Sequence, residues 1–103
     1  MTVKVKSVYE DLKYENVDEM LIKARLVTEI ADQLRRRGLT QADASELLGF
    51  SQPKLSNLLR GQFRGVSEKK LMECLTKLGR DIEIVVRPAP RSRREGRITV
   101  AVS

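Results

Sequence analysis

Residues 39–61 read LTQADASELLGFSQPKLSNLLRG, and two short helical patterns lie end to end within them. Thr40 precedes the first pattern and Ser51 precedes the second. Both residue types cap helix N-termini, because their hydroxyl oxygens accept hydrogen bonds from free backbone amides. Gly49 stands between the patterns, where the chain needs the positive φ that glycine adopts without strain. The stretch therefore predicts two helices joined by a tight turn.

The predicted turn, residues 49–51, has the length found in a helix-turn-helix unit. In such a unit the second helix lies in the major groove of DNA, so the sequence predicts a DNA-binding domain. Apolar spacing assigns six residues to the inner faces of the two helices: Ala44, Leu47, Leu48, Leu55, Leu58 and Leu59. Ser45 is expected on the helix surface.

Further helical patterns flank this unit on both sides. Upstream, apolar residues at helical intervals predict a helix over residues 17–37, with Asn16 as its N-cap. A separate helical turn over residues 7–12 follows from the capping-box spacing of Ser7 and Glu10. Downstream, Ser67 caps a helix that ends at Gly79. The whole pattern predicts a mainly α fold of four to five helices.

The periodicity changes after Gly79. Apolar and polar residues alternate over residues 81–87, which predicts a β-strand, and they alternate again from Ile98 in a further short strand. The connection between the two is long for a hairpin, and an isolated two-stranded ribbon is marginal in water. We therefore expect strand 81–87 to pair with its counterpart in a second copy of the chain, with Ile82, Ile84 and Val86 as the dimerisation residues.

The chain has 103 residues, a net charge of +6 and the length of one small domain. Its excess positive charge is concentrated between Arg87 and Arg97, where five arginines accompany one acid, Glu95. This Arg-rich segment has three interpretations: a contact with DNA phosphates, a polar linker that protects a sheet edge, or a mobile tail. A DNA partner fits this charge, although the overall charge alone does not establish it.

The composition argues against several classes of protein. Cys74 is the single cysteine and cannot form an intrachain disulfide, which fits a reducing cytoplasm. No apolar run is long enough for a membrane span, and no signal peptide is visible. The sequence has no histidine, phosphate-binding loop or metal-ligand spacing, so we expect neither an enzyme nor a cofactor. Cys74 is expected to pack as a small apolar residue, with a redox sensor as the alternative.

The stretch 39–61 resembles the helix-turn-helix of the Cro/cI repressor (XRE) superfamily. The matching residues are Leu39, Thr40, Gln41, Ala44, Leu48, Gly49, Ser51, Gln52, Leu55, Ser56, Arg60 and Gly61. With the flanking helices, the resemblance extends over roughly residues 17–79. It implies a lambda-repressor-like fold and a dimeric transcriptional regulator that binds a palindromic operator. Pro53 departs from the family pattern, because it stiffens the reading helix and removes one backbone donor.

Three residues on the outer face of the second helix are candidates for base contacts. They are Gln52, Lys54 and Asn57. Glutamine can pair bidentately with adenine, and lysine can donate to guanine O6 or N7. The alternative is that these side chains form a solvated face only. The candidates for phosphate contacts, some placed by the resemblance, are Gln41, Ser51, Ser56, Arg60, Gln62 and Arg64. Arg35, Arg36 and Arg37 either touch phosphate or complement the dipole of the first helix.

The wider layout is similar to a branch of the XRE group that includes HigA-type antitoxins. It comprises an acidic leader (residues 1–16), a DNA-binding domain (17–80), a dimerisation strand (81–87) and a basic linker with a last strand (88–103). This resemblance implies a cytoplasmic autorepressor, nucleoid-associated when bound to DNA, that also silences a basic toxin. The candidate docking residues are Tyr9, Glu10, Asp11 and Glu15. They are equally interpreted as a solvated helix cap. The alternative function is a protein-interaction module that chiefly inhibits a toxin enzyme.

Overall fold

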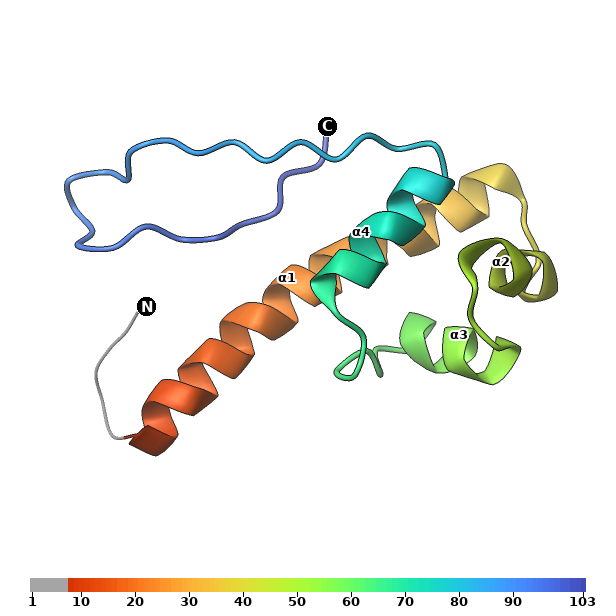
Figure 1. Ribbon diagram of the computed structural model, residues 1–103, viewed down its shortest axis with the longest axis horizontal. Helices are drawn as coiled ribbons and strands as arrows, with labels where there is room; N and C mark the ends of the chain where they lie inside the picture. Colours follow the sequence, from red (N-terminus) through yellow and green to blue (C-terminus); the bar gives the residue numbers. More distant parts are fainter. Residues whose placement is uncertain (1–7) are drawn as a thin grey trace.

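The computed structural model describes residues 8–103, with side chains described from residue 18 onward. The described part of the chain contains four helices: α1 (Val8–Arg37), α2 (Gln41–Leu48), α3 (Gln52–Leu59) and α4 (Glu68–Lys77). Figure 1 shows α4 lying along α1, with α2 and α3 packed at one end of this pair. The prediction of a mainly helical domain is confirmed.

Helix α1 is longer than the sequence pattern predicted. It runs from Val8 to Arg37 without interruption, so the separate turn over residues 7–12 and the N-cap at Asn16 are wrong. Residues 12–16 include no glycine or proline, so the free-energy cost of continuing the helix through them is small. The boundary expected between leader and domain, after residue 16, falls inside this helix.

The three N-caps predicted for the shorter helices are confirmed. The hydroxyl oxygens of Thr40, Ser51 and Ser67 each accept a hydrogen bond from the amide three residues later, at 3.1, 3.2 and 3.1 Å. These bonds satisfy amides that the first turn of a helix leaves without a partner. The caps therefore fix where α2, α3 and α4 begin.

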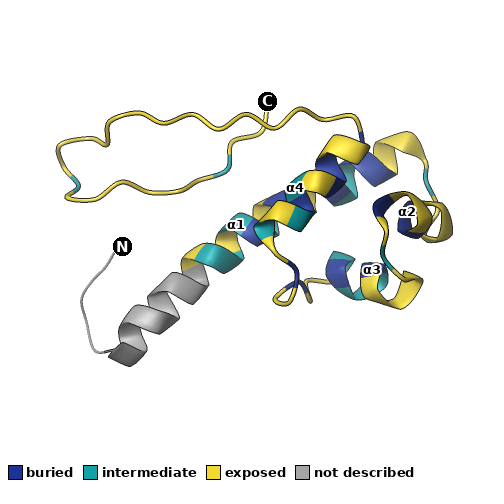
Figure 2. Cartoon of the chain, in the orientation of Figure 1, coloured by how far each residue is buried: buried dark blue, intermediate teal, exposed yellow. Residues whose placement is uncertain are grey.

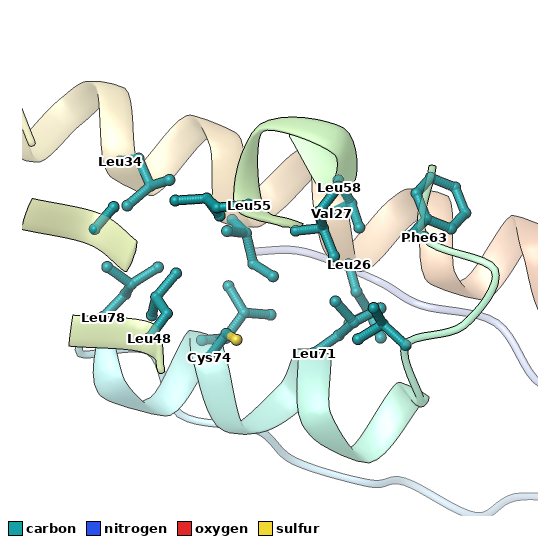
Figure 3. Close-up of a cluster of buried hydrophobic side chains, with 14 residues drawn as sticks. Leu26, Val27, Leu34, Leu48, Leu55, Leu58, Phe63, Leu71, Cys74 and Leu78 are labelled. Carbon is teal, nitrogen blue, oxygen red and sulfur yellow. The ribbon is translucent and has the colours of Figure 1, made fainter. Parts of the chain in front are cut away.

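The core lies where the four helices meet, as Figure 3 shows. Its fully buried side chains are Ile30, Leu48, Leu55, Leu58, Leu71 and Cys74. Two assignments on α2 were wrong: Leu47 is 39% exposed and Ser45 is buried. In this helix the inner face is formed by Ala44, Ser45 and Leu48. The Ser45 hydroxyl donates to the Ala42 carbonyl at 2.9 Å, so its burial leaves no polar group unsatisfied.

Residues 80–103, here called the C-terminal arm, contain no strand. The prediction of strands over residues 81–87 and 98–102 was therefore wrong. The arm leaves α4, loops outward and returns (Figure 1). The Arg80 guanidinium donates to the Ser103 oxygen at 3.3 Å. It is exposed along most of its length (Figure 2). A strand needs a neighbouring strand to pair its backbone groups, and residues 81–87 have no backbone hydrogen bond within the described chain.

Candidate nucleic-acid interface

The turn between α2 and α3 is closed by backbone hydrogen bonds. Gly49 has a φ of 79°, and the amides of Gly49 and Phe50 both donate to the Ser45 carbonyl, at 2.9 and 3.0 Å. The Lys70 ammonium lies over the Phe50 ring, 5.1 Å from its centroid. This cation–π contact connects α4 to the turn. The turn between α2 and α3 is therefore held by its own backbone bonds and by a contact from α4.

Helix α3 presents one apolar and one polar face. Leu55 and Leu58 have no exposed surface, so they anchor the helix in the core. Away from these leucines, Gln52 and Lys54 are exposed, and Asn57 is half-buried. The structure thus places the three predicted base-contact residues on the outer face of the helix, where they are available to a groove of DNA.

Three residues at the end of α3 form a polar cluster. The Arg60 Nη1 donates to Ser56 Oγ at 2.8 Å, and its Nη2 donates to Asn57 Oδ1 at 2.5 Å. One guanidinium therefore bridges a predicted phosphate contact and a predicted base contact. The spacing that permits this is i, i+3 and i, i+4 on one helical face, a signal that the sequence contains.

The loop after α3 is held to the rest of the domain by buried side chains and by Lys23 of α1. Phe63 and Val66 are buried in the core. The Lys23 ammonium donates to the Arg64 carbonyl at 2.9 Å and pairs with the Glu19 carboxylate at 3.1 Å. The Lys23 side chain is only 4% exposed. Sequence reasoning missed this lysine, although it lies one turn before Leu26 on the buried stripe of α1.

The remaining predicted phosphate contacts surround α3 at exposed positions. Gln41 is the first residue of α2, and Ser51 is the N-cap of α3. Gln62 and Arg64 lie in the loop after α3 and are both exposed, although the Arg64 backbone is held by Lys23. Together with the end of α3, these positions could flank a DNA groove on either side of the reading helix.

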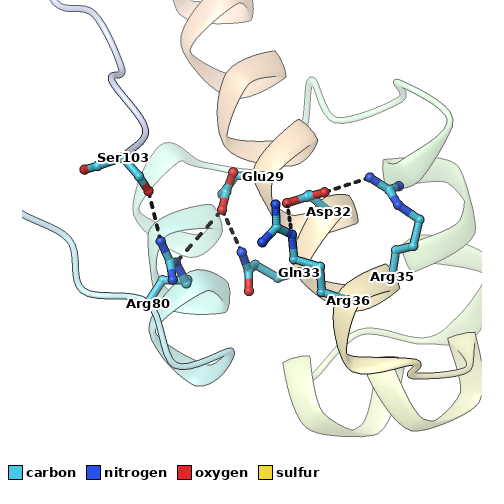
Figure 4. A network of polar contacts seen from close by, with 7 residues as sticks. All are labelled: Glu29, Asp32, Gln33, Arg35, Arg36, Arg80 and Ser103. Atoms are coloured by element: carbon cyan, nitrogen blue, oxygen red, sulfur yellow. Dashed lines mark hydrogen bonds and ion pairs between the residues drawn. The ribbon is translucent and has the colours of Figure 1, made fainter.

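The arginines at the end of α1 are engaged in local ion pairs. Arg35 and Arg36 both contact the Asp32 carboxylate, at 2.7 and 2.8 Å (Figure 4). Both side chains are more than 70% exposed, so these pairs contribute little to stability. The geometry fits charge compensation on α1 itself, and a phosphate contact by these arginines stays a prediction.

Arg80 connects the C-terminal arm to α1. Its guanidinium lies 3.9 Å from the Glu29 carboxylate, which also accepts a hydrogen bond from Gln33 at 2.8 Å (Figure 4). The predicted dimerisation residues lie further along the arm, where Ile84 and Val86 are 79% and 91% exposed and Ile82 is 38% exposed. The side chains of Tyr9, Glu10, Asp11 and Glu15 lie outside the described residues.

Among residues 18–103, whose side chains the structure describes, the two hollows below are small. The hollow lined by Glu19, Met20, Lys23 and Arg64 encloses about 90 Å³, and that lined by Arg25, Thr28, Glu29 and Val102 about 230 Å³. Both are smaller than the roughly 300–1,000 Å³ of typical ligand sites. Among the side chains that the structure describes, no acidic, histidine or cysteine cluster is arranged to hold a metal. None of the helices described is long and apolar enough to cross a membrane.

Cys74 is 1% exposed and packs in the core, as predicted. Burial raises the pKa of its thiol because the charged thiolate loses solvation, although the nearby Lys70 and Lys77 act in the opposite direction. The reactive thiolate is therefore disfavoured in the folded chain. This environment argues against a role for Cys74 as a redox sensor.

Comparison with known proteins agrees with this geometry. A family model described as "Helix-turn-helix domain" matches residues 8–87. A solved structure whose name places it in the XRE family of transcriptional regulators superimposes with a TM-score of 0.79. It is 39% identical in sequence, and the match covers 85% of this chain and 99% of that one. No curated protein matches this chain.

Proposed function

The chain belongs to the helix-turn-helix domain family, with the XRE-type fold of a DNA-binding transcriptional regulator, and we propose that it represses its own promoter as a homodimer. In this proposal α3 enters the major groove of a palindromic operator. The site of action is then the cytoplasm, at the nucleoid. The observation that carries the proposal is the division of α3 into a buried leucine face and an exposed polar face.

Base contacts are assigned to the exposed face of α3. Gln52 and Lys54 lie in its first turn, and Asn57 follows one turn later. The N-terminal residues of a reading helix contact base edges in this class of domain, which fits Gln52 and Lys54. Asn57 lies in the second half of α3 and is assigned from its polar side chain. Amide and ammonium groups supply the donors and acceptors that distinguish base pairs in the major groove.

Phosphate contacts are assigned to the polar residues around that face. These contacts fix the register of the protein on the duplex without reading its sequence. The residues proposed for this role are Gln41, Ser51, Ser56, Arg60, Gln62 and Arg64. The arrangement is supported by the loop anchor at Lys23, which holds the Arg64 backbone against α1.

Homodimerisation is assigned to the C-terminal arm. Its residues 81–87 have no backbone hydrogen bonds in the described chain, and Ile84 and Val86 are largely exposed. An unpaired apolar segment of this kind is a template for pairing with another chain. A second copy would satisfy the backbone groups about a two-fold axis and would place two reading helices about 34 Å apart, one turn of DNA.

The test is footprinting of the full chain on a duplex that carries its own promoter, followed by gel-shift titration. We expect protection of two half-sites one helical turn apart. Lys54→Ala should weaken this binding, whereas the matched control Lys77→Ala removes the same charge from the end of α4 and should not. Absence of protection on that promoter would contradict autorepression. Equal effects of the two variants would contradict the assignment of α3.

A second candidate function is inhibition of a basic toxin enzyme, favoured by the acidic character of the first turns of α1. That segment includes Glu10, Asp11 and Glu15, with Tyr9 beside them. A segment of this charge complements a basic partner. The experiment is a pull-down with the product of the neighbouring gene. We expect the full chain to bind and a chain without residues 1–13 not to bind. Equal binding by the two would exclude this docking segment.

A further inference from the structure

The hydrogen bonds of Arg60 determine which groups the end of α3 can offer to DNA. A guanidinium carries N–H donors only and has no acceptor. The Asn57 side-chain atom that faces Arg60 must therefore be the carbonyl oxygen, Oδ1, and the amide nitrogen Nδ2 must face away. In the same way, Ser56 Oγ uses a lone pair to accept from Arg60, which leaves its O–H free to donate.

We infer that Arg60 presets Ser56 and Asn57 as hydrogen-bond donors, so that this cluster takes an acceptor-only group of DNA and not the mixed edge of adenine. The inference rests on the proposed function, since it concerns how α3 reads an operator. The free donors of the cluster are the Asn57 amide hydrogens, the Ser56 hydroxyl and the N–H groups of Arg60 that neither bond uses. They point to guanine O6 and N7, or to a phosphate oxygen, as the ligand.

Adenine fits this cluster poorly. Asparagine normally reads adenine by accepting from the N6 amine with Oδ1 while Nδ2 donates to N7. Here Oδ1 already accepts a charge-assisted bond from Arg60, which is stronger than a bond between neutral groups. The positive guanidinium also repels the partly positive hydrogens of the adenine amine. The direction of the hydrogen bond from Arg60 to Asn57 therefore bears on base preference.

The half-buried position of Asn57 strengthens this argument. Asn57 and Ser56 are both only partly exposed, whereas Arg60 is exposed at the C-cap of α3. A partly buried amide has fewer rotamers available and loses less freedom when it is held. Arg60 can therefore bind a phosphate with its remaining N–H groups and still hold Asn57 in the donor orientation.

The experiment is selection of binding sites from a randomised duplex library by the full chain, in parallel with its Asn57→Ala and Arg60→Met variants. Comparison of wild type with Asn57→Ala identifies the position that depends on Asn57. We expect guanine there for the wild type, and a preference for guanine over adenine that falls about fivefold in Arg60→Met, since one hydrogen bond is at stake. Arg60→Lys keeps the charge but loses the two-pronged geometry, so it should resemble Arg60→Met in preference.

Two modified duplexes distinguish the sources of the acceptor. Replacement of the selected guanine by 7-deazaguanine should weaken the wild type and leave Asn57→Ala unaffected if a base is read. A neutral methylphosphonate should do the same if a phosphate is bound, and then no base preference should depend on Asn57. Either result supports the donor assignment if Arg60→Met is less sensitive to the same modification than the wild type. Where a base is read, an adenine that depends on Asn57, or a guanine preference unchanged in Arg60→Met, would overturn the inference alone. Where a phosphate is bound, a methylphosphonate effect unchanged in Arg60→Met would do so. Enrichment of no sequence by the wild type would overturn the proposed function as well.

Discussion

The buried ammonium of Lys23 donates to the backbone carbonyl of Arg64, 41 residues further along the chain, at 2.9 Å. This bond connects the middle of α1 to the loop that follows α3. Because the Glu19 carboxylate lies 3.1 Å from the same ammonium, the charge of Lys23 is compensated even though the side chain is 4% exposed. The loop that carries Arg64 and Gln62 therefore takes its position from α1.

The first prediction concerns this anchor. Lys23→Met keeps the aliphatic volume but leaves the Arg64 carbonyl without its partner. We therefore expect the free energy of unfolding to fall by roughly 1–3 kcal/mol. Urea denaturation followed by circular dichroism measures this loss. Lys77→Met is the matched control, since Lys77 is exposed and its removal should change stability little. Equal stability of the two variants would show that the Lys23 bond does not hold the loop.

The second prediction concerns base contacts. Gln52→Ala and Asn57→Ala should each weaken binding to the promoter duplex by about 1–3 kcal/mol, because each truncation removes hydrogen-bonding groups from the outer face of α3. Fluorescence anisotropy gives the affinity, and thermal melting should show an unchanged fold. Unchanged affinity in both variants would mean that the outer face of α3 is a solvated surface only.

The third prediction concerns phosphate contacts, and it compares Arg64 in the loop after α3 with the Arg-rich segment. Each lost phosphate contact reduces the slope of log affinity against log salt by about 0.9. Arg64→Ala should therefore lower this slope by about that amount. Replacement of Arg91, Arg93 and Arg94 by glutamine should leave the slope unchanged if the segment is a mobile tail or a polar linker, and should lower it by up to about 2.7 if all three contact phosphate. Titrations at several salt concentrations distinguish these interpretations.

The fourth prediction concerns the dimer. Ile84→Asp places a charge on the face of the arm that carries Ile82 and Val86, and it should yield a monomer in light scattering after size exclusion. Val85→Asp is the control, because residue 85 points to the opposite face of an extended segment and is likewise exposed. We expect this control to stay dimeric. A wild-type chain that is monomeric at high concentration would contradict pairing through the arm.

Local signals were the part of the fold that could be predicted from the sequence. Thr40, Ser51 and Ser67 cap their helices through bonds to amides three residues away, so their effect is contained within one turn of chain. The positive φ of Gly49 is local in the same sense. These features determine where α2 and α3 begin and where the turn between them lies.

Features that depend on distant contacts could not be predicted in this way. Burial of Lys23 becomes favourable only when the fold brings Glu19 and the Arg64 carbonyl to it. Pattern reasoning treats a lysine as a surface residue, so the site was missed. The strand over residues 81–87 was predicted from alternation alone, yet alternation supplies no partner for its backbone groups. The contact of Arg60 with Ser56 and Asn57 could have been predicted from their helical spacing. Its significance, however, depends on the direction of each hydrogen bond.

The fifth prediction concerns the pH dependence of stability at Cys74. Burial raises the pKa of this thiol in the folded chain, so the thiol stabilises the fold fully below the pKa of the unfolded thiol, about 8.5. Above that pH the unfolded chain loses the proton first, and the contribution declines as the pH rises towards the folded pKa.

The measurement is urea unfolding of the wild type and of Cys74→Ala between pH 7 and pH 10. The alanine variant carries every other titrating group, so subtraction isolates the thiol. We expect the stability advantage of the wild type to be constant up to about pH 8 and then to shrink, by at most about 1.4 kcal/mol per pH unit. An advantage that stayed constant to pH 10 would show that Cys74 ionises as readily in the folded chain as in the unfolded one.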